Sequence, residues 1–281
     1  MRGSSNGLSA CSPTTLDSEE TAMPTQVADH ATVHDSRFDH QTAMALAAEE
    51  YTRFADTLVG LAEEDWQMPT SCTGWTIRDM AGHTLGMAEL AGSLPEMARQ
   101  LIRASRAAKR SGKPQVDELT DLQVRKHEQL RVADLVGAVQ RIGPKAVAGR
   151  RRRPALMRAM TIIDQGPDGA SPERWKVGFL TDTILTRDPW MHRSDIAQAL
   201  GRPMKLTREH DGVVVADVVA EWALRHGQPF DLILTGPAGG RWTSGASGAS
   251  GEAISLDAEQ FCRILSGRGS GAGLMATFVP F

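Results

Sequence analysis

Apolar and polar positions alternate with a helical period over most of the chain, beginning near Phe38. In the first such stretch the apolar residues recur at steps of three and four, which places them on one face of an α-helix. They are Ala43, Leu46, Ala47, Tyr51, Phe54, Leu58 and Leu61. A loop that contains Pro69 and Gly74 follows this stretch. The pattern predicts an amphipathic helix with one buried face.

Further helical stretches follow the loop. Thr76 is a candidate N-cap with Asp79 three residues later, and together they predict the start of a helix that runs through Leu90 and kinks at Pro95. Residues 116–130 and 131–148 predict one long or two shorter helices, interrupted near residues 143–144, and residues 173–200 predict another. Four main helices with these connections are typical of a helical bundle, which we expect over residues 38–203.

The pattern changes after Gly201-Arg202-Pro203. We expect a helix over residues 211–225, short strands over 230–235 and 253–256, and a helix from Asp257 through Leu265. This stretch is rich in glycine and predicts a small α/β domain over residues 204–281, so the fold class is α+β. Residues 1–37 are polar without periodicity and predict a disordered tail.

Composition excludes several classes of protein. The 281 residues carry a net charge of −3, with 41% hydrophobic and 23% charged residues, as in ordinary globular proteins. This charge gives no overall attraction to nucleic acid or to an anionic membrane. The longest apolar run, residues 212–224, is interrupted by Asp217 and Glu221, so we expect no membrane span. The N-terminus has no apolar stretch of the kind found in signal peptides, and three scattered cysteines predict a reducing, cytoplasmic location.

The candidate chemistry lies in residues 183–200. Asp188 and His192 are four residues apart, so on a helix their side chains share one face, where a carboxylate and an imidazole form half of a metal site. Pro189 opens a second interpretation, in which Asp188 is a helix N-cap with the proline in the first turn. His83, on or near an apolar helix face, is either a third ligand or a histidine satisfied within the core.

Three groups of residues resemble motifs of the DinB-like, mycothiol-dependent maleylpyruvate isomerase family. The first group runs from Asp65-Trp66 through the stretch from Pro69 to Asp79 and ends at Gly82-His83, and the second runs from Asp188 to Gly201. The third runs from Leu234 to Trp242 and from Asp257 to Arg268. The resemblance covers about residues 40–281. It implies a four-helix bundle that holds a divalent metal, usually zinc, followed by a small α/β domain.

Carried over by motif position, the metal ligands are His83, Asp188 and His192, and the cosubstrate is the thiol mycothiol. The resemblance implies isomerisation of, or S-transfer to, a small electrophile such as maleylpyruvate. The alternative is a non-catalytic metal-binding or regulatory protein on the same scaffold. Arg268 is the candidate catalytic residue for an anionic substrate, because a guanidinium binds a carboxylate through two hydrogen bonds; the other interpretation is a charge at the end of a helix.

Other polar residues receive structural interpretations. We expect Arg193 and Asp195 to pair or to orient the ligands, Cys72 to pack within its loop, and Trp66, Trp75 and Trp190 to line the core or a pocket. The run Arg150–Arg153 is interpreted as a solvated loop in preference to a nucleic-acid patch. The expected partners are a small electrophile and a thiol, without nucleic acid or membrane, in a monomer or small homo-oligomer.

Overall fold

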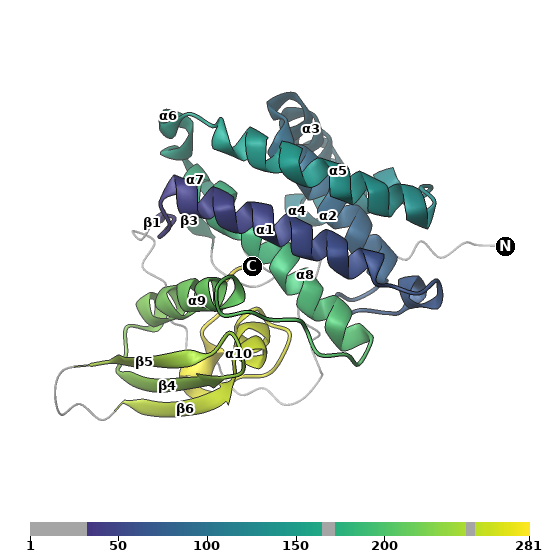
Figure 1. Ribbon diagram of the computed structural model, residues 1–281. Helices are drawn as coiled ribbons and strands as arrows, with labels where there is room; N and C mark the ends of the chain where they lie inside the picture. The colour runs from purple at the N-terminus through teal and green to yellow at the C-terminus, as the bar shows by residue number, and fades with distance from the viewer. Residues whose placement is uncertain (1–32, 165–171, 246–250) are drawn as a thin grey trace. The chain divides into compact units, whose positions relative to one another are not determined.

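The structure of the protein is a computed structural model that describes residues 33–164, 172–245 and 251–281 (Figure 1). These residues divide into two units, one ending at Leu200 and one beginning at Gly201, and each is described by itself. Among the described residues no helix combines the length and the apolar character that crossing a membrane requires.

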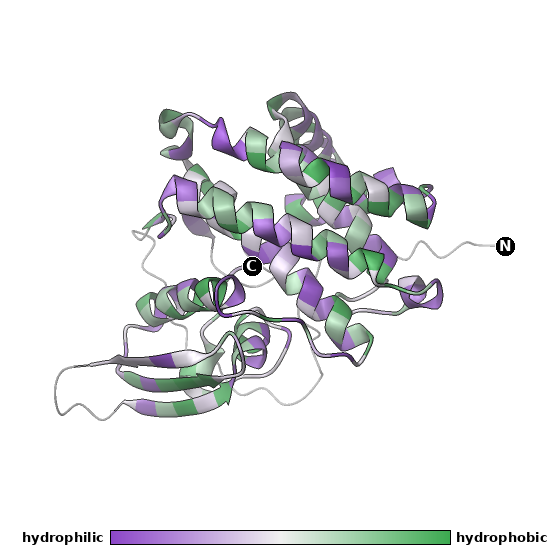
Figure 2. Ribbon diagram, viewed as in Figure 1, coloured by the Kyte–Doolittle hydropathy of each residue, from purple (hydrophilic) through white to green (hydrophobic). Residues whose placement is uncertain are grey.

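Four helices of the first unit form a bundle: α1 (His40–Val59), α2 (Ile77–Gly92), α5 (Val132–Arg151) and α8 (Leu185–Ala199). Both α1 and α2 pack against α5 on one side and α8 on the other, which closes the ring of contacts (Figure 1). Helices α3 (Leu94–Ser111) and α4 (Gln115–His127) form a hairpin that packs on α2. Figure 2 shows hydrophobic and hydrophilic residues interspersed along these helices, as the three- and four-residue spacing predicts.

The predicted helix starts follow from capping. The Asp39 carboxylate accepts a hydrogen bond from the Thr42 amide at 2.9 Å and starts α1. Thr76 and Asp79 form a reciprocal capping box at the start of α2, with 2.9 Å between the Thr76 amide nitrogen and Asp79 Oδ2. The N-cap of α1 and the capping box of α2 both satisfy amide groups that have no partner within the helix. The start of α2 determines the position of His83 in its second turn.

Glycines allow α2 and α5 to approach closely. A Cβ atom on Gly149 would lie 2.5 Å from the carbonyl oxygen of Gly92, a distance that real Cβ atoms do not show. Since the Cβ is fixed to the main chain of α5 and the carbonyl oxygen belongs to the main chain of α2, the only relief would be movement of one helix away from the other. The glycine pair therefore sets the separation of the helix that carries His83 and the helix that carries Arg150.

Short elements connect the bundle helices. They comprise a 3₁₀-helix (Glu64–Gln67), helices α6 (Ala155–Arg158) and α7 (Val177–Phe179), and a π-helix (Leu180–Ile184) directly before α8. Strand β3 (Glu173–Lys176) pairs in parallel with β1 (Val33–His34) and antiparallel with β2 (Thr161–Asp164), in register from Thr161 opposite Lys176 to Asp164 opposite Glu173.

The second unit consists of α9 (Asp211–His226), strands β4 (Phe230–Thr235), β5 (Gly240–Ser244) and β6 (Glu252–Asp257), α10 (Ala258–Leu265) and a 3₁₀-helix (Gly273–Ala276). The sheet order is β5-β4-β6, with β4 antiparallel to β5 and parallel to β6. Trp222 is fully buried, and its ring meets those of Phe230 and Phe261 edge to face at 4.8 and 5.4 Å. The α+β fold class predicted from the sequence is confirmed.

Several predicted details are wrong. The helix expected from residue 173 begins with a strand, because these residues pair with a segment that only the folded chain brings alongside them. Helix α5 continues through Pro144, since its packing against α1 and α2 outweighs one missing hydrogen bond. Pro95 opens a new helix, α3, and does not kink α2. Val33 and His34 form a strand within the predicted tail, and the tail up to residue 32 lies outside the described residues.

Candidate metal centre

The residue at which α8 begins determines whether Asp188 is a helix N-cap or a residue inside the helix. Helix α8 starts at Leu185, so both Asp188 and Pro189 lie inside it and the N-cap interpretation of Asp188 is wrong. Asp188 and His192 are therefore one helical turn apart on the same face. A proline inside a helix lacks the amide hydrogen that would bond to the carbonyl four residues earlier, here that of Leu185, at a cost of ~3 kcal/mol or more.

Helices α2 and α8 bring the three predicted ligands together. Asp188 Oδ1 lies 3.5 Å from His83 Nε2 and 3.3 Å from His192 Nε2. One potential ligand atom from each residue lies within 4.8 Å of the other two. Both imidazoles are buried, with 4% and 3% of their residue surface exposed, whereas the Asp188 side chain keeps 18% of its surface. The group thus has a buried side and one partly open side.

The protonation of this group reflects its charges. Burial lowers the pKa of His192, but the Asp188 carboxylate and hydrogen bonds to Asp188 and Asp195 outweigh it and raise the pKa to about 9. Burial alone would raise the pKa of Asp188, yet the two histidines hold it well below its usual range. The ionised Asp188 carboxylate therefore favours a positive charge beside it, either the proton on His192 or a cation that takes the place of this proton.

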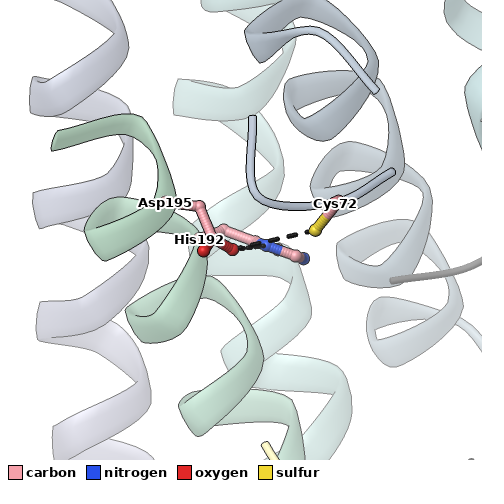
Figure 3. A group of neighbouring side chains, drawn as sticks. All are labelled: Cys72, His192 and Asp195. Carbon is pink, nitrogen blue, oxygen red and sulfur yellow. Dashed lines mark hydrogen bonds and ion pairs between the residues drawn. The ribbon is translucent and has the colours of Figure 1, made fainter. Parts of the chain in front are cut away.

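Asp195 orients His192 from the opposite side of the ring. His192 Nδ1 and Asp195 Oδ2 are 3.2 Å apart, and Asp195 is fully buried. The Cys72 sulfur lies 3.8 Å from the same carboxylate oxygen (Figure 3). If Asp195 accepts a hydrogen bond from Nδ1, the other ring nitrogen, Nε2, is the one that faces Asp188. Asp195 thus makes the contact with the His192 ring that was expected of a residue orienting a ligand.

Cys72, His192 and Asp195 are themselves a second group of potential ligand atoms within 4.8 Å of one another. Figure 3 shows His192 and Asp195 projecting from α8 toward Cys72 on the loop before α2. Both groups share His192 but use opposite ring nitrogens. The buried hydrogen bond of Asp195 to Nδ1 suits a supporting role for this second group. Its closeness to His192 could not be read from the spacing of Cys72 in the sequence.

Trp75 covers one side of the imidazoles. Its ring centroid lies 5.0 Å from that of His83 and 6.3 Å from that of His192, and the two imidazoles meet edge to face at 5.3 Å. Trp75 and Trp190 are buried, as expected of core or pocket-wall residues. The contact excludes water from the ring faces, which strengthens electrostatic interactions within the group.

The donor set fits a divalent cation. Among the described residues, His192 Nε2, the nitrogen that faces Asp188, is buried without an aligned hydrogen-bond partner, and buried polar atoms of this kind normally have one. Two imidazoles and a carboxylate within reach of one ion are a common ligand set of catalytic zinc, which leaves a fourth position open. His83, Asp188 and His192 could hold such an ion.

Two polar residues of the bundle were missed by sequence reasoning. Glu50 is fully buried and receives two hydrogen bonds from Arg193, at 2.7 and 2.9 Å. Its position four residues after Leu46 and four before Phe54 sets it in the apolar stripe of α1, a signal that was available. Arg193 is thus paired with α1.

Arg150 is the second missed residue. The run Arg150–Arg153 ends α5, and Arg150 and Arg153 are 0% and 5% exposed, so the solvated-loop interpretation is wrong for both. Arg150 continues the apolar stripe of Val139, Gly143 and Val147 along α5, which carries its side chain inward. Within a run of four arginines, the period of the helix still determines which side chains point toward the core and which point to solvent.

Arg268, the candidate catalytic residue, belongs to the second unit. It follows α10, and its backbone amide donates to the Arg263 carbonyl at 2.8 Å. Arg241, another arginine of the second unit, is exposed on β5 and pairs with Asp231 at 2.8 Å.

Comparison with known proteins bears on this site. Residues 47–197, more than half of the chain, match the family model of the mycothiol maleylpyruvate isomerase N-terminal domain. The chain belongs to this family. The family resemblance predicted from the sequence is therefore confirmed, and the matched segment contains His83, Asp188 and His192.

Solved structures support the fold. The chain is similar to a crystal structure of the mycothiol-dependent maleylpyruvate isomerase and to one of a histidine-to-alanine mutant of that enzyme. Each has a TM-score of 0.50 and 15% sequence identity; the matches cover 84% and 83% of this chain and 92% and 91% of theirs. At this identity the likeness concerns the fold. A search of the curated proteins found none that matches the chain.

Proposed function

We propose that the protein is a metal-dependent enzyme that activates mycothiol for isomerisation of, or S-transfer to, a small electrophile such as maleylpyruvate. The observation that carries the proposal is the grouping of His83, Asp188 and His192, whose potential ligand atoms lie within 4.8 Å of one another. Membership of the mycothiol maleylpyruvate isomerase family supports the choice of thiol and substrate class.

A bound zinc ion would supply a Lewis acid that lowers the pKa of a thiol, which in water is near 8.5 and mostly protonated at neutral pH. His83 and His192 would contribute neutral nitrogen donors, and Asp188 a negative charge that reduces the net charge of the site. Asp195, 3.2 Å from Nδ1, would keep the proton of His192 on that nitrogen and leave Nε2 to bind the ion. Trp75 shields both imidazoles from water.

The thiolate would add to an electron-poor double bond, and rotation about the resulting single bond followed by elimination would yield the trans isomer. Addition of the thiolate followed by protonation of the resulting enolate, in place of elimination, would instead yield a stable conjugate. In either case the nucleophile comes from the cosubstrate, so the protein's own groups bind, orient and exclude water. We propose that Arg268 binds a carboxylate of the substrate, on the strength of its place in the family motif and the geometry of its guanidinium.

Metal content and thiol transfer test the proposal together. Elemental analysis of the purified full chain should show one equivalent of zinc, which His83→Ala should abolish. The zinc-loaded protein should then isomerise maleylpyruvate or conjugate an electrophile only when mycothiol is added. Zinc binding without either reaction would favour the non-catalytic metal-binding protein, and no zinc after reconstitution would remove the metal centre itself.

A further inference from the structure

Helix α8 has a local defect at the point where it presents Asp188. Pro189 has no amide hydrogen, so the helical hydrogen bond to the carbonyl of Leu185 cannot form. The π-helix Leu180–Ile184 ends directly before this carbonyl, so the hydrogen-bond register of the chain changes there as well. Two irregularities thus meet within one turn of a proposed metal ligand.

Arg150 of α5 satisfies the carbonyl that the proline leaves without its helical donor. Its Nη1 donates to the Leu185 carbonyl oxygen at 3.2 Å, and its Nη2 donates to Thr186 Oγ1 at 2.8 Å. The guanidinium thereby holds two consecutive residues of α8 in the turn that precedes Asp188.

The burial of Arg150 is unusual for a cation. Arg150 is 0% exposed, and over the described ranges 33–164, 172–245 and 251–281 it makes no ion pair with a carboxylate. A buried guanidinium is costly unless its donors are satisfied. Here Nη1 and Nη2 are directed to a carbonyl and a hydroxyl of α8, whereas Nε has no hydrogen-bond partner among the described residues. An apolar residue at the same place would fill the space but leave the Leu185 carbonyl buried without this donor.

We propose that Arg150 is a positioning residue for the metal centre: by hydrogen bonding to Leu185 and Thr186 it stabilises α8 across Pro189 and fixes Asp188 beside His83 and His192. The inference rests on the proposed function for the role of Asp188. It adds a residue that would touch neither the metal nor the substrate, and it explains how a proline is tolerated next to a ligand.

The test is a double-mutant cycle between positions 150 and 189 in the full chain. Arg150→Met removes the donor, whereas Pro189→Ala restores an amide hydrogen that can reach the Leu185 carbonyl without help. We expect Arg150→Met to weaken zinc binding by about 10-fold or more, within the range seen for residues that orient ligands. In the Pro189→Ala background the same substitution should weaken zinc binding at most two- to threefold.

Three readouts are measured for each of the four proteins: zinc affinity by competition with a chelating dye, the visible spectrum of the Co²⁺-substituted protein, and the midpoint of unfolding without metal. The Co²⁺ spectrum reports the ligand geometry, which general destabilisation of the bundle would not change. Arg150→Met should alter the spectrum, and the added Pro189→Ala should restore it.

Arg153→Met is the matched control. Arg153 lies on the same stretch of chain, is 5% exposed and donates to the Ala91 carbonyl of α2 at 3.0 Å. Its loss should lower the unfolding midpoint without altering the Co²⁺ spectrum, and its effect should be independent of position 189.

Equal losses of zinc affinity from Arg150→Met in both backgrounds, or an unchanged Co²⁺ spectrum, would overturn the proposal. If Arg150→Met does not fold, Arg150→Lys serves in the same cycle, because an ammonium lacks the planar fork of two nitrogens that donates to Leu185 and Thr186 at once. Failure of the unmodified protein to bind zinc would overturn the metal centre and with it this role for Arg150. The coupling between the two positions in the metal-free midpoint would then still measure the contact of Arg150 with α8.

Discussion

At the scale of single residues, His192 is the side chain on which the candidate site converges. One ring nitrogen faces Asp188 at 3.3 Å and the other faces Asp195 at 3.2 Å. The imidazole thus lies between a proposed ligand and a supporting carboxylate, both from its own helix. Of the two acidic residues, only the Asp188 side chain is partly exposed, so only Asp188 can be reached by an ion or a small molecule from outside.

Asp195→Asn tests the supporting carboxylate. The substitution keeps the size of the side chain but allows it to donate to His192 Nδ1, which favours the wrong tautomer. We expect zinc affinity to fall by about 10- to 100-fold while the fold is retained. Competition with a chelating dye measures the affinity, and circular dichroism checks the fold.

Asp134→Asn is the control for this experiment, because Asp134 is exposed, pairs with Arg131 at 2.7 Å and belongs to none of the groups of potential ligands among the described residues. Unchanged zinc affinity in Asp195→Asn would show that His192 needs no orienting partner.

At the scale of elements, the separation of α2 and α5 depends on a glycine contact. Adding a methyl group at Gly149 would place it 2.5 Å from the Gly92 carbonyl oxygen. Gly149→Ala should therefore lower the free energy of unfolding by about 1–3 kcal/mol, although alanine is the better helix former. Urea unfolding of the metal-free protein measures the difference.

Gly137→Ala provides the comparison on the same helix. A Cβ there would meet only the guanidinium end of Arg141, which can move aside. That substitution should be neutral or stabilise the protein by up to about 1 kcal/mol. Equal effects at the two positions would mean that helix propensity, and not the close approach of α2 and α5, decides the outcome.

At the scale of the whole molecule, a metal in the first unit should stabilise that unit. With free zinc at 100 times its dissociation constant, linkage adds about 2.7 kcal/mol to the folded state. For a domain of this size that corresponds to a rise of roughly 5–10 °C in the unfolding midpoint of the first unit. Differential scanning calorimetry with zinc or with a chelator measures the rise, and a His83→Ala protein that still responded equally would contradict the site.

Arg268, proposed above to bind a carboxylate of the substrate, is tested by substitution. Arg268→Ala should raise KM for an anionic substrate by about 10-fold or more, because a charge-assisted hydrogen bond contributes ~1.5–3 kcal/mol. Zinc content should not change. Arg241→Ala is the control, since Arg241 is exposed and pairs with Asp231. Steady-state kinetics of both variants measure the change. If the KM of Arg268→Ala matched that of the unmodified protein, Arg268 would have a structural role only.

The local pattern of residues in the sequence was sufficient to predict the helices of the bundle, the fold class and the family. Apolar spacing, the Thr76–Asp79 cap and the glycine-rich change after residue 200 predicted the bundle helices and the α+β class, because these signals act within a few residues. The motifs around His83 and around Asp188 to His192 likewise identified the family and the candidate ligands, which the family model confirms for the family alone.

Tertiary structure decided what depends on distant partners. The strand at Glu173–Lys176 exists because Thr161–Asp164 lies beside it, and no four-residue pattern can show that. Asp188 lies inside a helix despite Pro189, and Arg150 and Glu50 are buried because other helices supply their partners. A proline or a charge has a local preference readable from sequence, but whether it is overridden depends on hydrogen bonds that form only when segments far apart in the chain meet.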